Sequence, residues 1–176
     1  MTDSDGREPE GIAREVCLRL LSARPRTRAE LETALAKREV APDVARRVLD
    51  RFEELRWVDD AAYAGAWVQS RHAHRGLSRR ALAQELRQRG VAAEQVEAAV
   101  DAVSDEDEEA TAFRLARVRA AATTRLARDV RIRRLTGVLL RRGYSSSLTT
   151  RAVLAALDGP SALDDLRDEQ GLTDDG

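Results

Sequence analysis

Residues that support disulfide frameworks, membrane spans and secretion are missing from this sequence. The single cysteine, Cys17, can form neither an intrachain disulfide bond nor a cysteine metal cluster. No apolar run approaches the ~20 residues that a membrane-spanning helix needs, and residues 1–10 lack the basic and apolar regions of a signal peptide. We therefore expect a soluble, cytoplasmic protein without a membrane partner.

Aromatic and turn-forming residues are also few. The 176 residues include two each of Trp, Tyr and Phe, ten glycines and four prolines. β-branched residues do not alternate with polar ones, as they do in half-buried strands. Alanine, leucine, arginine and glutamate dominate instead, and these residues favour helices. The composition therefore predicts an all-α fold.

Residues that usually carry catalysis or bind metals are sparse and poorly placed. The only histidines, His72 and His74, are two positions apart, which directs them to different sides of a helix. Cys17 has no histidine near it in the sequence, so a small buried residue is the better interpretation. We find no phosphate-binding glycine loop and no distinct pair of carboxylates. We expect neither enzymatic activity nor a metal ion or cofactor.

Charges of opposite sign are separated along the chain. The net charge is −1, but residues 1–10 and 159–176 contain 10 of the 31 acidic residues and only 2 of the 30 basic ones. Residues 11–158 therefore carry 28 basic and 21 acidic residues, a net charge of +7. The two ends are polar and without periodicity, and we predict disordered acidic tails there. The basic body favours an acidic protein surface or nucleic acid as partner.

A pair of leucines one helical turn apart occurs three times, at offsets of 51 and 53 residues. The pairs are Leu31 and Leu35, Leu82 and Leu86, and Leu135 and Leu139. An arginine-led turn follows each pair: Arg38-Glu39-Val40, Arg89-Gly90-Val91 and Arg142-Gly143-Tyr144. Such a period is typical of tandem three-helix units, each too small to bury its apolar face alone and each stacked on the next. We predict repeats over residues 11–58, 59–104 and 105–158, between tails at 1–10 and 159–176.

Local signals mark the ends of the predicted helices. Thr27 and Glu30 match a capping box, in which each side chain binds a backbone N–H at the start of a helix. The sequence also predicts a first helix from about Gly11 to Ala23. Further helices should start at Pro42, Asp59-Asp60 and Ser78, and the chain should break at Gly76, Gly90 and Gly143. Glu39 occupies the place of these last two glycines in the first repeat. Glutamate in a left-handed conformation costs about 1 kcal/mol relative to glycine, so we expect the first turn to be built differently.

Two aromatic residues, Tyr63 and Trp67, lie one helical turn apart in the second repeat. A platform on which nucleic-acid bases stack would need both rings exposed on a basic face. Nothing in the sequence indicates such exposure, so we expect both rings to pack in the core.

The second repeat has a recognisable order of residues. It reads Leu55-x-x-Val58-Asp59-Asp60, Tyr63-Ala64, Trp67-Val68, Arg71, Arg75-Gly76-Leu77-Ser78, Glu85-Leu86 and Arg89-Gly90-Val91. In this order and spacing the residues resemble the RecX family of regulatory proteins. The first and third repeats match the family in Leu20-Leu21-Ser22-Ala23-Arg24-Pro25-Arg26-Thr27-Arg28-x-Glu30-Leu31 and Leu139-Leu140-Arg141-Arg142-Gly143-Tyr144-Ser145. The resemblance covers about Val16 to Leu157.

The resemblance implies both a shape and a partner. RecX-like proteins are elongated, curved arrays of nine helices in three tandem three-helix repeats. They bind the RecA recombinase filament on DNA and block its extension or promote its disassembly. In this way they restrain its ATPase, strand exchange and coprotease stimulation, and so modulate homologous recombination, DNA repair and the SOS response.

Arginines are the candidate binding residues. Lys37 is the only lysine, so many of the 29 arginines serve as ordinary surface charge. Two stretches nevertheless contain far more arginines than acidic residues. Residues 71–89 include six arginines and one acid, and residues 114–151 include eleven arginines and one acid. Arginine's planar fork can bind carboxylates and phosphates at two points. We predict one basic surface from Arg71, Arg75, Arg79, Arg80 and Arg87, and a second from Arg131, Arg133, Arg134, Arg141 and Arg142.

Three functional classes fit these features. The leading hypothesis is a non-enzymatic, monomeric RecX-like modulator of the RecA filament, with weak, sequence-indifferent DNA binding. The alternative is a direct helix-turn-helix-like DNA-binding protein, which would bind naked DNA tightly with steep salt dependence. A structural adaptor for another acidic partner would show neither property.

Overall fold

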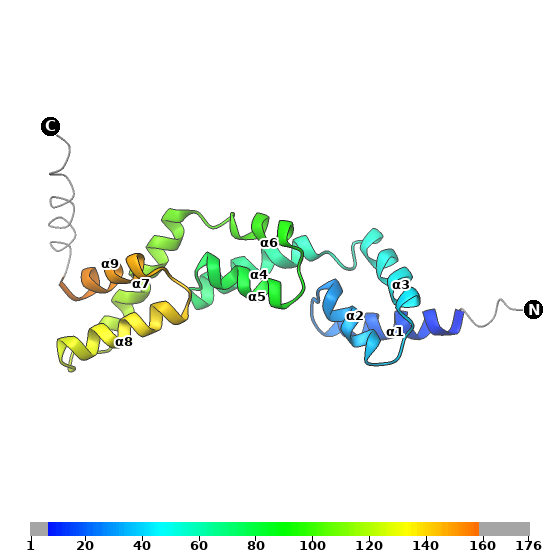
Figure 1. The fold of residues 1–176 in the computed structure, drawn as a ribbon, viewed down its shortest axis with the longest axis horizontal. Coiled ribbons are helices and arrows are strands. Elements are labelled where there is room, and N and C mark those ends of the chain that lie inside the picture. Colours follow the sequence, from blue (N-terminus) through cyan, green and yellow to red (C-terminus); the bar gives the residue numbers. More distant parts are fainter. Residues whose placement is uncertain (1–6, 159–176) are drawn as a thin grey trace, which may run out of the picture. The chain divides into compact units, whose positions relative to one another are not determined.

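The computed structural model describes residues 7–158, and in this range it contains nine α-helices and no strand (Figure 1). The all-α prediction is therefore confirmed. The helices are α1 (Arg7–Ala23), α2 (Arg28–Ala36), α3 (Pro42–Glu54), α4 (Asp60–Arg75), α5 (Arg79–Gln88), α6 (Ala93–Val100), α7 (Asp105–Ala121), α8 (Arg128–Arg141) and α9 (Ser146–Asp158). The predicted C-terminal tail, 159–176, and residues 1–6 of the predicted N-terminal tail lie outside the described residues.

Helix α1 begins at Arg7, one turn before the expected start near Gly11. A contact distant in sequence supports this additional turn, because the Glu10 carboxylate accepts a hydrogen bond from Arg47 Nε of α3 at 2.8 Å. Residues 7–10 of the predicted tail are thus helical.

The described residues form two compact packing units, residues 7–69 with 83–102 and residues 70–82 with 103–158. In the first unit, α1, α2 and α3 pack around buried residues that include Cys17, Leu31, Leu35 and Phe52. In the second unit, α7 packs against α8 and α9 through an alanine stripe at 112, 116 and 120. All three predicted leucine pairs are buried, with at most 2% of each residue exposed. The three repeat boundaries stay predictions, because these units reflect packing rather than sequence repeat.

The second helix of each repeat ends in the same turn. The N–H groups of Val40, Val91 and Tyr144 donate to the carbonyls of Leu35, Leu86 and Leu139 at 3.2, 3.2 and 3.3 Å. The residue between, Glu39, Gly90 or Gly143, has a φ of 59°, 78° or 89°. This is the paired hydrogen-bond pattern of a left-handed helix end. The expectation that the first turn is built differently was therefore wrong.

The surroundings of these turns explain why glutamate is tolerated only in the first. A Cβ atom at Gly90 would lie 2.3 Å from Ala29 Cβ, and one at Gly143 would lie 2.4 Å from Ser78 Oγ. Each glycine thus contacts the start of the second helix of the preceding repeat. Glu39 belongs to the first repeat and is exposed, so its side chain meets no such obstacle and the turn bears only the backbone strain.

A hydrogen bond to the carbonyl of the arginine in the turn joins each later turn to the helix start before it. In the first unit, the Thr27 hydroxyl donates to the Arg89 carbonyl at 2.7 Å. In the second unit, the Ser78 N–H donates to the Arg142 carbonyl at 3.0 Å. Thr27 and Ser78 are almost completely buried, so these bonds satisfy polar groups that water cannot reach.

Most of the predicted helix starts are confirmed, with two corrections. Asp59, Ser78 and Thr27 accept hydrogen bonds from the N–H groups of Ala62, Ala81 and Glu30 at 2.9, 3.2 and 3.2 Å. The Glu30 carboxylate does not complete the capping box, because it accepts hydrogen bonds from Arg89 and Arg24 instead. Asp60 is not a cap of α4 either, since its carboxylate accepts from the Arg28 N–H at the start of α2 at 2.9 Å.

Candidate basic interface

The two aromatic residues of the second repeat belong to a polar contact between repeats within the first unit. Trp67 Nε1 donates to Glu85 at 2.8 Å, and the Tyr63 ring stacks on Trp67 with centroids 5.8 Å apart. The Arg89 guanidinium lies 3.9 Å from the Trp67 ring centroid and donates to Glu30 at 2.6 Å. Both rings are half-buried rather than enclosed in the core as expected. Because Arg89 and Tyr63 already cover Trp67, this cluster is not an open stacking platform.

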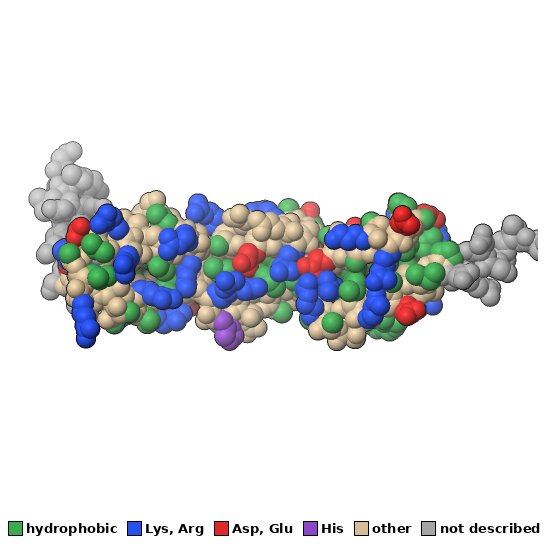
Figure 2. Space-filling view, turned by 90° about the horizontal axis from the view of Figure 1, so that it is seen from below, with side chains coloured by type: hydrophobic (Ala, Val, Ile, Leu, Met, Phe, Trp, Pro, Cys, Tyr) green, Lys and Arg blue, Asp and Glu red, His purple; other side chains and the backbone are tan. Residues whose placement is uncertain are grey.

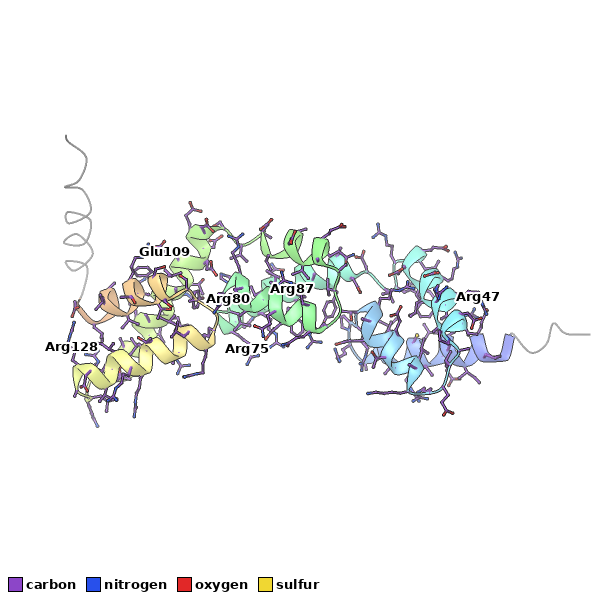
Figure 3. The ribbon with its side chains drawn as sticks, in the orientation of Figure 1. Arg47, Arg75, Arg80, Arg87, Glu109 and Arg128 are labelled. Carbon is purple, nitrogen blue, oxygen red and sulfur yellow. The ribbon has the colours of Figure 1, made fainter. Side chains whose placement is uncertain are left out.

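The residues of the first predicted basic surface differ in exposure and are divided between the two units. Arg79 belongs to the framework, because its N–H donates to Glu108 at 2.8 Å and its guanidinium to Asp105 at 2.5 Å, both at the start of α7. Arg71 is half-buried. Arg75 and Arg80 are exposed in the second unit, at the end of α4 and on α5, whereas the exposed Arg87 belongs to the first unit (Figure 3).

The second predicted surface also divides into framework and exposed residues. Arg131 is half-buried and donates to the Ala120 carbonyl at 3.3 Å. Arg142 donates to the Arg75 carbonyl at 2.6 Å, which ties the end of α8 to the end of α4. Burial lowers the pKa of Arg142, and the neighbouring positive charges of Arg119 and Arg75 lower it further. Arg142, Arg119 and Arg75 therefore lie close together in this part of the second unit.

The remaining arginines of the second surface line a groove between the end of α7 and α8. The groove has a volume of about 610 Å³. Its lining contains four arginines and no acidic residue: Arg119, Ala122, Thr123, Val130, Arg133, Arg134, Leu135, Gly137, Val138 and Arg141. Of the four arginines, Arg133 pairs with Asp129 at 3.6 Å, and both side chains are about three-quarters exposed. Such an exposed pair contributes little to stability.

Gly137 shapes the floor of this groove. It lies between Arg134 and Arg141 on one face of α8, three and four residues from them. A Cβ atom at this position would lie 3.0 Å from Arg141 Nη1, so the missing side chain leaves room for the Arg141 guanidinium over the helix. Glycine inside a helix is less favourable than alanine by about 1 kcal/mol. Gly137 therefore lowers the stability of α8 locally and leaves space for the Arg141 guanidinium in the groove.

The space-filling view shows the charge of this region. At the left of Figure 2, over the second unit, blue Lys and Arg side chains predominate over red Asp and Glu side chains. Apolar groups lie among them, in agreement with the Ala, Val and Leu side chains of the groove lining. An arginine rim over an apolar floor suits a ligand that carries both anionic and apolar groups.

Sequence reasoning did not assign Arg119 and Gly137 to the groove. Arg119 lies in a biased stretch but was not assigned to a surface, because only the packing of α7 on α8 brings it beside Arg134. Gly137 did carry a usable signal, since an isolated glycine within a helical pattern often has a packing or functional reason.

His72 and Cys17, which were considered for metal binding or catalysis, have structural roles. His72 Nδ1 donates to the Leu77 carbonyl at 2.9 Å, and Nε2 lies within hydrogen-bond distance of the Thr111 hydroxyl, at 3.1 Å. Burial raises the pKa of the Cys17 thiol to about 11, which disfavours the reactive thiolate. Within residues 7–158 no cluster of three metal-binding side chains occurs, and no helix in that range could cross a membrane.

Comparisons with known proteins agree on one family. A model of the first three-helix domain of RecX matches residues 13–52, and a model of the second matches residues 59–100. The regulatory protein RecX of Thermobifida fusca is 58% identical over 146 residues, which cover 83% of this chain and 79% of that protein. RecX of Streptomyces coelicolor is 50% identical over 152 residues, covering 86% and 81%.

Solved structures show the same fold at much lower identity. The crystal structure of RecX from Lactobacillus salivarius superposes with a TM-score of 0.75 at 19% identity, covering 86% of this chain and 98% of that chain. A second RecX crystal structure gives a TM-score of 0.73 at 21% identity, covering 82% and 72%.

Proposed function

Because this chain belongs to the RecX family of regulatory proteins, we propose that it binds the RecA nucleoprotein filament and inhibits filament extension, ATPase and strand exchange. Through this inhibition it would modulate homologous recombination, DNA repair and the SOS response. The protein acts in the cytoplasm as a monomer and without catalysis of its own.

The observation that carries this proposal is the excess of positive charge in the second unit. The α7–α8 groove has four arginines and no acid, and Arg142 lies close enough to Arg119 and Arg75 for their charges to lower its pKa. Like charges repel, so a surface that served stability alone would interleave acidic residues. The exposed Arg75 and Arg80 of the same unit add to this surface. An anionic partner supplies the missing charge.

The proposed mechanism is steric and electrostatic. Arginine side chains bind acidic side chains of neighbouring RecA subunits, and the bound repeats compete with contacts that subunit addition or ATP-linked closure requires. Phosphates of the DNA within the filament contribute weak contacts that do not depend on sequence. Arg79, Arg131 and Arg142 hold the framework of the second unit, and exposed residues such as Arg134 and Arg141 contact the partner.

The test is ATP hydrolysis by the cognate RecA on single-stranded DNA, with this protein titrated at substoichiometric levels. The variant R134E/R141E should raise the concentration for half-inhibition about tenfold or more, equivalent to ~1.4 kcal/mol of binding free energy. The matched control is R117E/R125E, which makes the same change in net charge at exposed positions that do not line the groove. Circular dichroism checks that both variants remain folded.

Binding to naked DNA, measured in the same buffer, separates the functional classes. Inhibition at protein levels too low to coat the DNA supports action on the filament. Tight, salt-sensitive binding to naked DNA without inhibition of RecA would instead support the direct DNA-binding alternative. Equal inhibition by R134E/R141E and the wild-type protein would remove the groove from the proposed interface.

A further inference from the structure

We propose that residues 159–176 dock in the α7–α8 groove of the same molecule, so that the free protein occupies its own anion-binding groove with an acidic segment. The regulatory consequence, that a filament must displace this segment, rests on the proposed function. The docking itself does not, because both groove and segment belong to this chain.

The composition of the segment is complementary to the groove. Residues 159–176 contain six acidic residues and one arginine. Leucines flank the first acidic pair, in the order Leu163-Asp164-Asp165-Leu166. The groove offers four arginines with Ala122, Val130, Leu135 and Val138 between them. Carboxylates can pair with the arginines while leucines cover the apolar floor, which makes an acidic peptide a better occupant than a phosphodiester chain without apolar side chains.

The chain also leaves the described residues at a suitable place. Arg128, the first residue of α8 (labelled in Figure 3), binds the carboxylate of Asp158, the last residue of α9, with Nη2 2.8 Å from Oδ2. Arg134 and Arg141 follow on α8 at roughly 9 and 20 Å along the helix axis from Arg128. An extended chain advances about 3.3 Å per residue, so Asp164 can reach roughly 20 Å from Asp158. The first acidic pairs of the segment can therefore reach the full length of the groove.

Such docking would be reversible. Exposed ion pairs are individually weak and are screened by salt. Tethering compensates for this weakness, since a short flexible connection gives an effective concentration in the millimolar range. A multivalent anionic partner can then displace the segment, because the same loss of apparent affinity leaves a tight ligand bound and a weak, isolated anion unbound.

Paramagnetic NMR on the full-length chain tests the docking without any partner. A spin label at Gly171→Cys can be attached selectively, because Cys17 is buried and burial raises its pKa to about 11. We expect preferential broadening of amide signals of residues 130–141. This broadening should persist in the control variant R117E/R125E. It should be lost at high salt and in R134E/R141E. It should also be lost when Asp164, Asp165 and Asp168 are replaced by Asn and Glu169 by Gln. Equal broadening in R134E/R141E, or none in α8 of the otherwise unmodified chain, would overturn the proposal.

A binding experiment tests the competition with named probes. A fluorescent ten-residue polyglutamate peptide should bind the acid-neutralised chain at least fivefold more tightly than the natural one, and R134E/R141E should remove this difference. Equal affinities for both chains would refute the competition. Oligothymidylate serves as the nucleic-acid probe. If the groove binds oligothymidylate more tightly than the peptide and the signals of α8 are not broadened, the groove is a nucleic-acid site and the proposal is overturned. Because neither experiment contains RecA, failure here leaves the proposed function standing, and failure to inhibit RecA leaves the docking standing.

Discussion

Gly143 lies so close to Ser78 that a Cβ atom at position 143 would be 2.4 Å from the serine hydroxyl oxygen and 2.8 Å from Ala81 Cβ. The Ser78 N–H, in turn, donates to the carbonyl of the neighbouring Arg142. This close approach joins the turn after α8 to the start of α5, and the Gly90 turn contacts the start of α2 in the same way. The backbone of the turn therefore takes part directly in this contact between successive repeats.

Gly143→Ala should destabilise the protein strongly. The left-handed backbone adds roughly 1–2 kcal/mol of strain, and overpacking against Ser78 and Ala81 adds roughly 1–3 kcal/mol. We expect a lower thermal midpoint by circular dichroism. Glu39→Gly is the matched control, since it relieves strain at an exposed turn and should raise stability by up to about 1 kcal/mol. A Gly143→Ala protein as stable as the wild type would contradict the proposed contact.

Arg28→Ala should destabilise the first unit by about 2 kcal/mol. Its guanidinium donates to Glu53, Asp50 and Glu32 at 2.5, 2.7 and 3.0 Å, and only 22% of its side chain is exposed. Removing it leaves three carboxylates without their shared partner, and charged hydrogen bonds of this kind contribute roughly 1.5–3 kcal/mol.

The control for Arg28 is Arg47→Ala. Arg47 pairs with Glu10 and Asp43, but its side chain is 53% exposed, so its loss should destabilise the protein less than the loss of Arg28. Urea unfolding of both variants measures the difference. Equal destabilisation would show that the partial burial of Arg28 does not strengthen its ion pairs.

Gly137→Ala should separate stability from binding. The added methyl group improves helix propensity by about 1 kcal/mol, so we expect a higher thermal midpoint. The same methyl group comes within 3.0 Å of Arg141 Nη1 and displaces that guanidinium from the groove. Inhibition of RecA should therefore need a several-fold higher protein concentration. A gain in stability with unchanged inhibition would show that the space over Gly137 is not used in binding.

Stability should fall in alkaline solution between about pH 9 and pH 12. Burial raises the pKa of Tyr144 from 10.0 to about 12 and that of Cys17 from 9.0 to about 11. Both groups are neutral when protonated and keep their protons more tightly in the folded state. Their stabilisation is therefore complete below the unfolded pKa values and is lost as pH rises through the folded ones.

The free energy of unfolding should fall in alkaline solution by an amount of the order of 2–3 kcal/mol per group, because each pKa is raised by about two units in the folded protein. Urea midpoints measured from neutral pH upwards, together with tyrosinate absorbance, provide the test. Tyr144→Phe should flatten the upper part of the profile and lower stability at neutral pH by about 1 kcal/mol, because the Gly76 carbonyl loses the hydroxyl that donates to it at 3.0 Å. An unchanged alkaline profile in Tyr144→Phe would contradict this assignment.

Much of the local structure was predictable from the sequence. The leucine pairs, the start signals at Thr27, Asp59 and Ser78, and the left-handed Gly90 and Gly143 all occur as expected. Helix periodicity, capping and turn preference depend on residues within about four positions of one another, so a single sequence contains the needed information. The resemblance to RecX rested on the same local features in order, and the family comparisons confirmed it.

The tertiary structure alone decided which arginines are available to a partner. Arg79 and Arg142 looked equivalent to Arg80 and Arg141 in the sequence, yet their partners lie 26 and 67 residues away. It also brought Arg119 of α7 beside the arginines of α8 and gave the Glu39 turn room that the Gly90 turn lacks. Charge pairing and steric clearance depend on distances between groups that are remote along the chain. The sequence therefore determined the helices and their turns, and only packing determined which charges remain free for binding.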